Sequence, residues 1–225
     1  MCGRFALFHD AASLTNHVPI ERVAVSLQPR YNIAPTQAVA AVLCLPEEPG
    51  RTLDVLQWGL VPFWAKDARM GSRMINARAE TAAEKPAYRA AFKRRRCLLP
   101  ASGYYEWKKQ PHGKTPHYFS MADGRPFSMA GLWEEWNSPD GELLHTCSIL
   151  TTEASPGVAP IHHRMPIILD ADAQLRWLTT DPENRTQLQD MLKPYLRDDL
   201  RAHPVSTQMN AAAWDDPSCI EPVLG

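Results

Sequence analysis

The chain begins Met1-Cys2-Gly3-Arg4-Phe5, so loss of the initiator methionine would leave Cys2 as the first residue. Enzymes that remove Met1 favour a small second side chain, and cysteine qualifies. A terminal cysteine carries an α-amine beside its thiol, and this amine has an ordinary pKa of about 7.7–8.0, so much of it is neutral and nucleophilic near pH 7. Such an aminothiol can form an imine with an aldehyde and then close sulfur onto the imine carbon, giving a durable thiazolidine. The same opening also suits a nucleophile that attacks an amide, or a small residue that only permits Met1 removal.

Three internal segments also carry reactive side chains. Asn76 and Arg78 lie on the same side of an extended segment, because alternate side chains of a strand share a face. Glu106 stands among large aromatic residues, and desolvation there would raise the pKa of its carboxyl and let it pass a proton near neutral pH. His162 precedes Arg164 by two positions in a proline-bounded loop, which places an imidazole near a guanidinium.

These residues need a framework, and the pattern of apolar runs and turns predicts an α+β fold in one domain over residues 1–225. Its core is a curved, mostly antiparallel, open barrel-like sheet with peripheral helices. Gly or Asp-Gly separators between the middle runs favour tight hairpins. Expected strands are Gln37–Leu45, Leu53–Leu60, Cys97–Trp107, His117–Met121, Phe127–Trp136 and Leu143–Thr151. Expected helices are residues 10–18, 81–95, 171–179 and 183–192, with a turn over residues 46–50, a polar loop over 62–74 and an extended tail from His203 to Val223.

Composition excludes several classes of protein. Hydrophobic residues make up 44% of the 225 and charged residues 22%, which is typical of a globular protein. The formal net charge of −1 argues against general affinity for nucleic acid, so any such binding needs a local basic cleft. The basic run Lys93–Arg96 is expected to be a solvated helix end, and Trp58 a core residue.

The five cysteines are widely separated, and no His/Cys cluster has zinc spacing, so no metal site is expected. Cys44, Cys97 and Cys147 lie in apolar runs and are expected to be reduced core residues. The chain has no secretion signal and no apolar run long enough to cross a bilayer, which predicts a cytoplasmic protein that does not bind membranes. We expect a monomer.

Six ordered motifs resemble those of the SRAP family, the SOS-response-associated, abasic-site processing proteins. The motifs begin at residues 1, 30, 58, 75, 103 and 162, with sequences MCGRF, RYNIAP, WGL, INARAE, GYYEW and HHRMP. The resemblance implies a single SRAP domain, without a cofactor, that binds single-stranded DNA containing abasic sites. It also implies a covalent thiazolidine link to the ring-opened sugar aldehyde, which shields the site from strand cleavage. Lyase activity and self-processing peptidase activity are further implied.

The family resemblance assigns roles to matching residues. Cys2 becomes the nucleophile, Asn76 aims the α-amine, Glu106 moves protons at the amine or imine, and His162 moves protons at the sugar oxygen. The implied DNA-binding residues are Arg4, Asn32, Trp64, Arg78, Trp107 and Arg164, through phosphate contacts or base stacking. His163 departs from the family, in which an acidic or amide residue is common at this position.

Two other functions fit the same residues. An N-terminal-nucleophile amidohydrolase or cysteine peptidase would use Cys2 to attack an amide and would release a peptide or ammonia without DNA. A non-catalytic DNA-binding module would use Arg78 and the aromatic residues, and would bind single strands without covalent capture.

Overall fold

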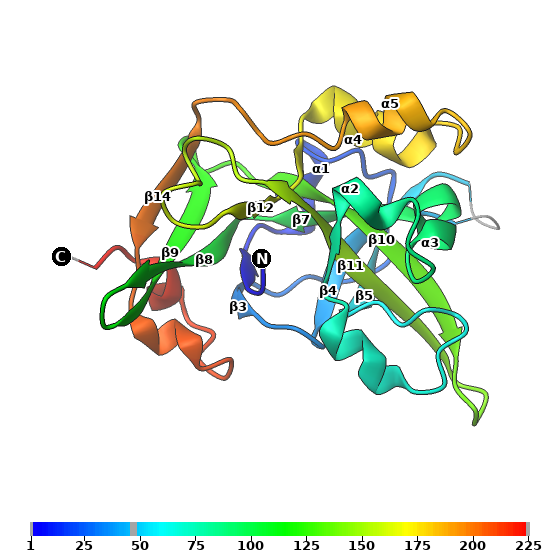
Figure 1. Cartoon of the computed structure of the whole chain (residues 1–225), viewed down its shortest axis with the longest axis horizontal. Helices are drawn as coiled ribbons and strands as arrows, with labels where there is room; N and C mark the ends of the chain where they lie inside the picture. Colours follow the sequence, from blue (N-terminus) through cyan, green and yellow to red (C-terminus); the bar gives the residue numbers. More distant parts are fainter. Residues whose placement is uncertain (1, 46–48, 224–225) are drawn as a thin grey trace.

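The computed structural model describes residues 2–45 and 49–223, so part of the expected turn over residues 46–50 lies outside the described residues. The strands are β1 Phe5–Leu7, β2 Arg22–Val23, β3 Arg30–Ile33, β4 Ala38–Cys44, β5 Arg51–Trp58, β6 Asn76–Arg78, β7 Arg96–Ala101, β8 Gly103–Gln110, β9 Gly113–Met121, β10 Phe127–Asn137, β11 Leu143–Glu153, β12 Arg164–Pro166, β13 Ile168–Leu169 and β14 Leu200–Pro204 (Figure 1). The helices are α1 Ala11–Thr15, α2 Ala79–Ala82, α3 Arg89–Arg94, α4 Ala171–Thr179 and α5 Arg185–Asp190, and 3-10 helices span Ala68–Arg73, Thr207–Asn210 and Pro217–Ile220.

The strands form two sheets, and the larger one closes on itself. Its order is β12-β11-β10-β7-β4-β5-β2, and β5 pairs in addition with β11 through Gln57 opposite Thr146. This pairing closes β11, β10, β7, β4 and β5 into a five-stranded barrel, which leaves these strands without open edges. The smaller sheet has the order β14-β9-β8-β1-β3. Most pairings are antiparallel, so the predicted α+β fold with a barrel-like, mostly antiparallel sheet is confirmed.

The expected single strand Cys97–Trp107 is wrong, because the chain changes sheet in its middle. β7 belongs to the barrel and β8 to the smaller sheet, with Ser102 between them. The hydroxyl of Ser102 accepts the backbone N–H of Phe8 at 3.0 Å, which ties the crossing to the end of β1. Gly103 is required beside it, since a Cβ there would collide with the Tyr118 ring and the Phe119 carbonyl. This change of sheet carries β8 alongside β1.

The expected helix over residues 81–95 is also wrong. Two short helices, α2 and α3, replace it, and Pro86 lies in the gap, where proline disfavours a continuous helix. The extended tail is interrupted by two 3-10 helices, and the expected polar loop contains one more. The prediction for α4 is confirmed, and α5 is shorter than expected. No helix within the described residues is long and apolar enough to cross a membrane.

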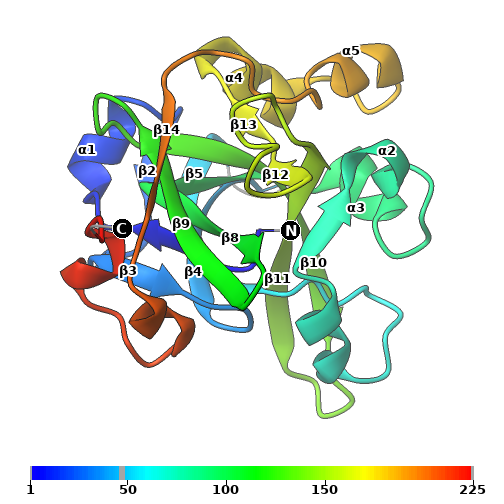
Figure 2. The same cartoon turned by 60° about the vertical axis from the view of Figure 1, so that its left-hand side comes forward.

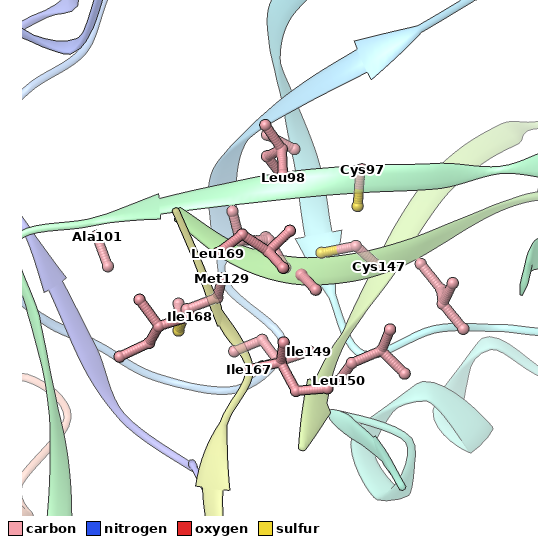
Figure 3. Packing of buried hydrophobic residues seen from close by; sticks show 14 of the residues in the cluster. Cys97, Leu98, Ala101, Met129, Cys147, Ile149, Leu150, Ile167, Ile168 and Leu169 are labelled. Carbon is pink, nitrogen blue, oxygen red and sulfur yellow. The ribbon is translucent and has the colours of Figure 1, made fainter. Parts of the chain in front are cut away.

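The barrel strands and the β12–β13 segment enclose the main hydrophobic core (Figure 3). Cys97 and Cys147 are fully buried there with free thiols, and burial raises the pKa of both thiols. The prediction that these two cysteines are reduced core residues is confirmed. Cys44, by contrast, is only half-buried. Trp58 is fully buried, as predicted.

The predicted solvated end of the basic run is wrong for Arg96. Its guanidinium is buried and donates to backbone carbonyls, including those of Phe92 at 3.0 Å and Trp177 at 2.6 Å. Arg95 forms an ion pair with the buried carboxylate of Glu134 at 2.6 Å. These two arginines therefore attach the end of α3 to the barrel strand β10 and to α4.

Candidate active site

Cys2 lies just upstream of β1, with Gly3 and Arg4 between them, and its side chain is fully buried. β1 pairs with β8, and the backbone N–H of Tyr105 donates to the carbonyl of Arg4 at 2.9 Å. This pairing fixes the start of the chain against β8. Burial raises the pKa of the Cys2 thiol, and the negative charge of Glu106 raises it further. The thiol is therefore protonated at neutral pH.

Asn76 contacts Cys2 from the barrel side. β6 runs parallel to β11, with Asn76 opposite Ile149, and the Nδ2 of Asn76 donates to the Cys2 carbonyl at 2.7 Å. The Tyr88 hydroxyl donates to the Asn76 carbonyl at 3.1 Å and so braces the strand. The Oδ1 of Asn76 is buried and has no hydrogen-bond partner among residues 2–45 and 49–223. One end of the amide thus holds Cys2, while the other end is an acceptor that is available next to it.

Glu106 and His162 lie close to each other near Cys2. β11 brings the segment of His162 near that of Asn76, because Thr151 lies opposite Arg78 of β6 on one side and Pro166 of β12 on the other. In Figure 2, β8, β11 and β12 meet around the start of the chain.

The two side chains lie close together. The Oε1 of Glu106 lies 3.7 Å from the Nδ1 of His162, which also accepts the backbone N–H of Arg164 at 3.1 Å. Glu106 is 2% exposed, and burial raises the pKa of its carboxyl, as predicted from its aromatic surroundings. Burial lowers the pKa of His162, so its imidazole is neutral at pH 7. The pair therefore combines an acid that retains its proton to higher pH with a neutral base.

Residues of this cluster line two separate grooves. The first, here called the Trp64 groove, has a volume of about 490 Å³ and is lined by Trp64, Asn76, Arg78, Thr81, Lys85, Pro86, Ala87 and Tyr88. The second, here called the Trp107 groove, has a volume of about 400 Å³ and is lined by Glu106, Trp107, Lys108, Lys109, Lys114, Ala159, Pro160, Ile161, His162 and His163. Asn76 lines the Trp64 groove and donates a hydrogen bond to the Cys2 carbonyl. Glu106 lines the Trp107 groove, and its negative charge raises the pKa of the Cys2 thiol. Cys2 itself lines neither groove, but it interacts with one residue of each.

The family model described as SOS response associated peptidase (SRAP) matches residues 1–212 of the chain. The chain belongs to the SRAP family. It is 38% identical over 224 residues to a Bacillus subtilis protein named abasic site processing protein YoqW, covering 98% of this chain and 99% of that protein. It is 34% identical over 197 residues to abasic site processing protein HMCES of Gallus gallus, covering 77% and 58% of the two chains. A crystal structure of a protein from Bacteroides thetaiotaomicron matches with a TM-score of 0.85 at 26% identity, covering 99% of this chain and 100% of that one.

Within this SRAP fold, the predicted DNA-binding residues fall into two groups. Trp64 is 47% exposed and Arg78 is exposed, and both line the Trp64 groove, where they are free to contact a ligand. Trp107 is half-buried in the Trp107 groove, and its Nε1 donates to the Asn210 side chain at 2.9 Å.

The second group is bonded within the SRAP chain itself. Arg4 donates to the Asn32 side chain at 2.7 Å and to the carbonyl of Met209 at 2.8 Å. Asn32 is fully buried, and its Nδ2 also donates to the Met209 carbonyl, at 2.9 Å. Arg164 makes a two-point contact with the Glu80 carboxylate at 2.6 and 3.0 Å. In this structure these three residues hold the two chain ends and the β12 segment in place.

Sequence reasoning missed the lysines of the Trp107 groove. Lys108 and Lys109 precede the Gly113 turn of the β8–β9 hairpin and Lys114 follows it, so the hairpin brings the three charges together. A signal was present, since basic residues on both sides of a tight turn must lie close in space. Among the described residues, no group of three or more His, Cys, Asp or Glu side chains is placed to bind a metal ion.

Proposed function

We propose that this protein recognises abasic sites in single-stranded DNA and captures them covalently through Cys2 once Met1 has been removed. It would act as a single-domain monomer. Membership of the SRAP family and the names of the relatives support the lesion as target. The observation that carries the proposal is that Cys2 interacts with one residue from each of two grooves, Asn76 and Glu106, and that both grooves contain a tryptophan and basic side chains. Aromatic stacking and cationic contacts are the features that hold single strands without base specificity.

The proposed reaction forms two bonds to the sugar aldehyde. The neutral α-amine of Cys2 attacks the aldehyde carbon and gives a carbinolamine. Loss of the hydroxyl as water leaves an iminium, and sulfur then bonds to the same carbon to close a thiazolidine. The proton lost from the thiol replaces the proton that left with water, so the sequence balances without an oxidant or a metal.

Glu106 can serve both proton transfers. Because burial raises the pKa of its carboxyl, it can donate a proton to the departing hydroxyl and then accept the thiol proton as sulfur attacks. The raised pKa of the Cys2 thiol makes such a base necessary, since the free thiolate is scarce. His162, neutral at pH 7, would move the proton that opens the sugar ring to its aldehyde form. The Oδ1 of Asn76 would accept a hydrogen bond from the amine and aim it.

A denaturing gel with an abasic-site oligonucleotide tests the proposal. The mature protein should give a heat-stable shifted band, and intact mass should show that Met1 is absent. Cys2→Ala should abolish the band, while Cys2→Ser should leave only an imine that borohydride traps. Cys44→Ala is the matched control and should cross-link like the wild type, because Cys44 lies outside both grooves. A stable link in Cys2→Ser, or no band with the wild type, would refute thiazolidine capture.

Strand cleavage and amide hydrolysis are two other reactions that Cys2 could catalyse, and the site suits the first better. An iminium makes the neighbouring sugar carbon more acidic, so slow strand cleavage by elimination would compete with ring closure. Amide hydrolysis fits less well, because a cysteine peptidase needs a thiolate and burial keeps the Cys2 thiol protonated. Release of peptide or ammonia in the absence of DNA would favour hydrolysis instead.

A further inference from the structure

A third groove lies beside the Trp64 groove and is the largest of the three. We name it the α3 groove; its volume is about 890 Å³, and its lining is Phe63, Ala83, Glu84, Arg89, Ala90, Lys93, Arg94, Arg95, Glu134, Glu135, Asn137 and Arg185. None of these residues belongs to the reaction centre around Cys2. The function proposed above leaves the groove unexplained.

We propose that the α3 groove binds the single strand several nucleotides away from the abasic site, so that DNA passes from the Trp64 groove across a ridge formed by Phe63 and Trp64. This inference rests on the proposed function, because it takes the lesion to lie at Cys2. It extends the DNA-binding surface to one side of the lesion only.

The two grooves are lined by residues that are neighbours along the chain, which is the first support. Phe63 lines the α3 groove and its neighbour Trp64 lines the Trp64 groove, with 60% and 47% of their surfaces exposed. The segment that contains α2 also lines both, with Ala83 in one groove and Thr81 in the other. A base stacked on Trp64 would therefore be followed, along the strand, by one that reaches Phe63.

The charge of the α3 groove is the second support. Its lining holds five basic and three acidic residues, although the whole chain has a formal net charge of −1. Arg89, Arg94 and Arg185 are exposed, and none forms an ion pair with another described residue. They are therefore available to bind phosphates.

Some of the other charged residues of the groove form ion pairs within the protein. Arg95 neutralises the buried carboxylate of Glu134, and Lys93 pairs with Glu183 at 3.2 Å. That second ion pair also links α3 to the residues just before α5, and Arg94 and Arg185 both line the groove. The acidic residues left in the lining are Glu84 and Glu135.

Length-dependent binding tests the inference. Three abasic-site oligonucleotides would be compared by fluorescence anisotropy: a short one with about two nucleotides on each side of the site, and two with about eight nucleotides added at the 5′ or the 3′ side. The wild type should bind one of the two extended strands more tightly than the short one. The triple variant Arg89→Gln, Arg94→Gln, Arg185→Gln should lose that gain and bind the short strand normally.

Salt dependence gives the expected size of the effect. Each phosphate that the protein neutralises on a single strand releases counterions and contributes about −0.7 to the slope of log K against log salt. Loss of three arginine contacts should therefore reduce the magnitude of that slope on the extended strand by about 2. Phe63→Ala should weaken the same complex by about 5- to 150-fold, the loss of one stacked base. The charge-matched control Arg176→Gln, Arg197→Gln, Arg201→Gln, on α4, β14 and the segment between them, should behave like the wild type.

The outcomes separate this inference from the proposed function. Equal binding of all three strands by the wild type would overturn it, as would a triple variant that binds the extended strand normally or loses the short one equally. If the wild type captures no abasic strand covalently, the proposed function fails, and undamaged thymidine strands of the same lengths still test the groove.

Discussion

Replacing Asn76 with alanine should slow covalent capture of an abasic site by about 5- to 150-fold. The amide holds the Cys2 carbonyl through a hydrogen bond of 2.7 Å, and its buried Oδ1 is the acceptor proposed for the α-amine. A neutral hydrogen bond contributes about 0.5–1.5 kcal/mol net, so two contribute about 1–3 kcal/mol. At about 1.36 kcal/mol per tenfold change in rate, that range gives the stated factor.

The variant Asn76→Asp distinguishes the role of the amide oxygen from that of the amide nitrogen. A carboxylate can still accept from the amine, but it cannot donate to the Cys2 carbonyl and instead repels its oxygen. Its negative charge also raises the pKa of the nearby amine, because an opposite charge favours the charged form. The rate of capture by this variant should therefore reach its plateau at higher pH than that of the wild type.

The assay is single-turnover capture by mature protein, quenched in denaturant and resolved on gels over a pH series. Asn16→Ala, at an exposed position after α1, is the matched control and should react like the wild type. The melting temperature of each variant is measured alongside the rate. Capture by Asn76→Ala at the wild-type rate, with unchanged stability, would refute the positioning role of this amide.

Three further predictions follow from the charged residues of the site. Burial raises the pKa of Glu106, so the stability that its bound proton contributes is full below the ordinary pKa of about 4.3 and is lost as pH rises through the raised value. Glu106→Gln should therefore gain in melting temperature relative to the wild type between pH of about 4 and 8, while capture slows by about 10²–10⁴-fold; a constant difference in melting temperature would contradict this. Arg164→Gln should lower the free energy of unfolding by about 3 kcal/mol or less, because its partner Glu80 is 45% exposed. The same variant should leave the salt slope of DNA binding unchanged, and a slope reduced by about 0.7 would reveal a phosphate contact. The double variant Lys109→Gln, Lys114→Gln should raise the pKa of His162, which both lysines lower, and reduce the salt slope by about 1.4; an unshifted His162 in an NMR titration would exclude the first effect.

Local sequence was sufficient for the chemistry of Glu106. Its aromatic neighbours are adjacent along one strand, so burial and the direction of its pKa shift could be predicted without knowing the fold. Trp64 and Arg78, which the family resemblance marks as DNA-binding residues, both line the Trp64 groove.

Partners that are distant in sequence left no such signal. Arg164 meets Glu80 across 84 positions, and Asn32 meets Met209 across 177, so each arginine or amide looked available to DNA when it was judged from its neighbours. The break at Ser102 was missed for a related reason. The residues on both sides are apolar and suit a strand, and only the arrangement of two sheets decides that the chain must turn between them.

The bond between Arg4 and the carbonyl of Met209 has a consequence during synthesis. The two residues are 205 positions apart, and a ribosome adds about 5–20 residues per second, so about 10–40 s pass between them. Throughout that interval the segment that contains Cys2 lacks the bond from Arg4, two residues further along, to the Met209 carbonyl. The segment around Cys2 is therefore held by fewer contacts in a nascent chain, until the residues near Met209 have been made and bond to Arg4.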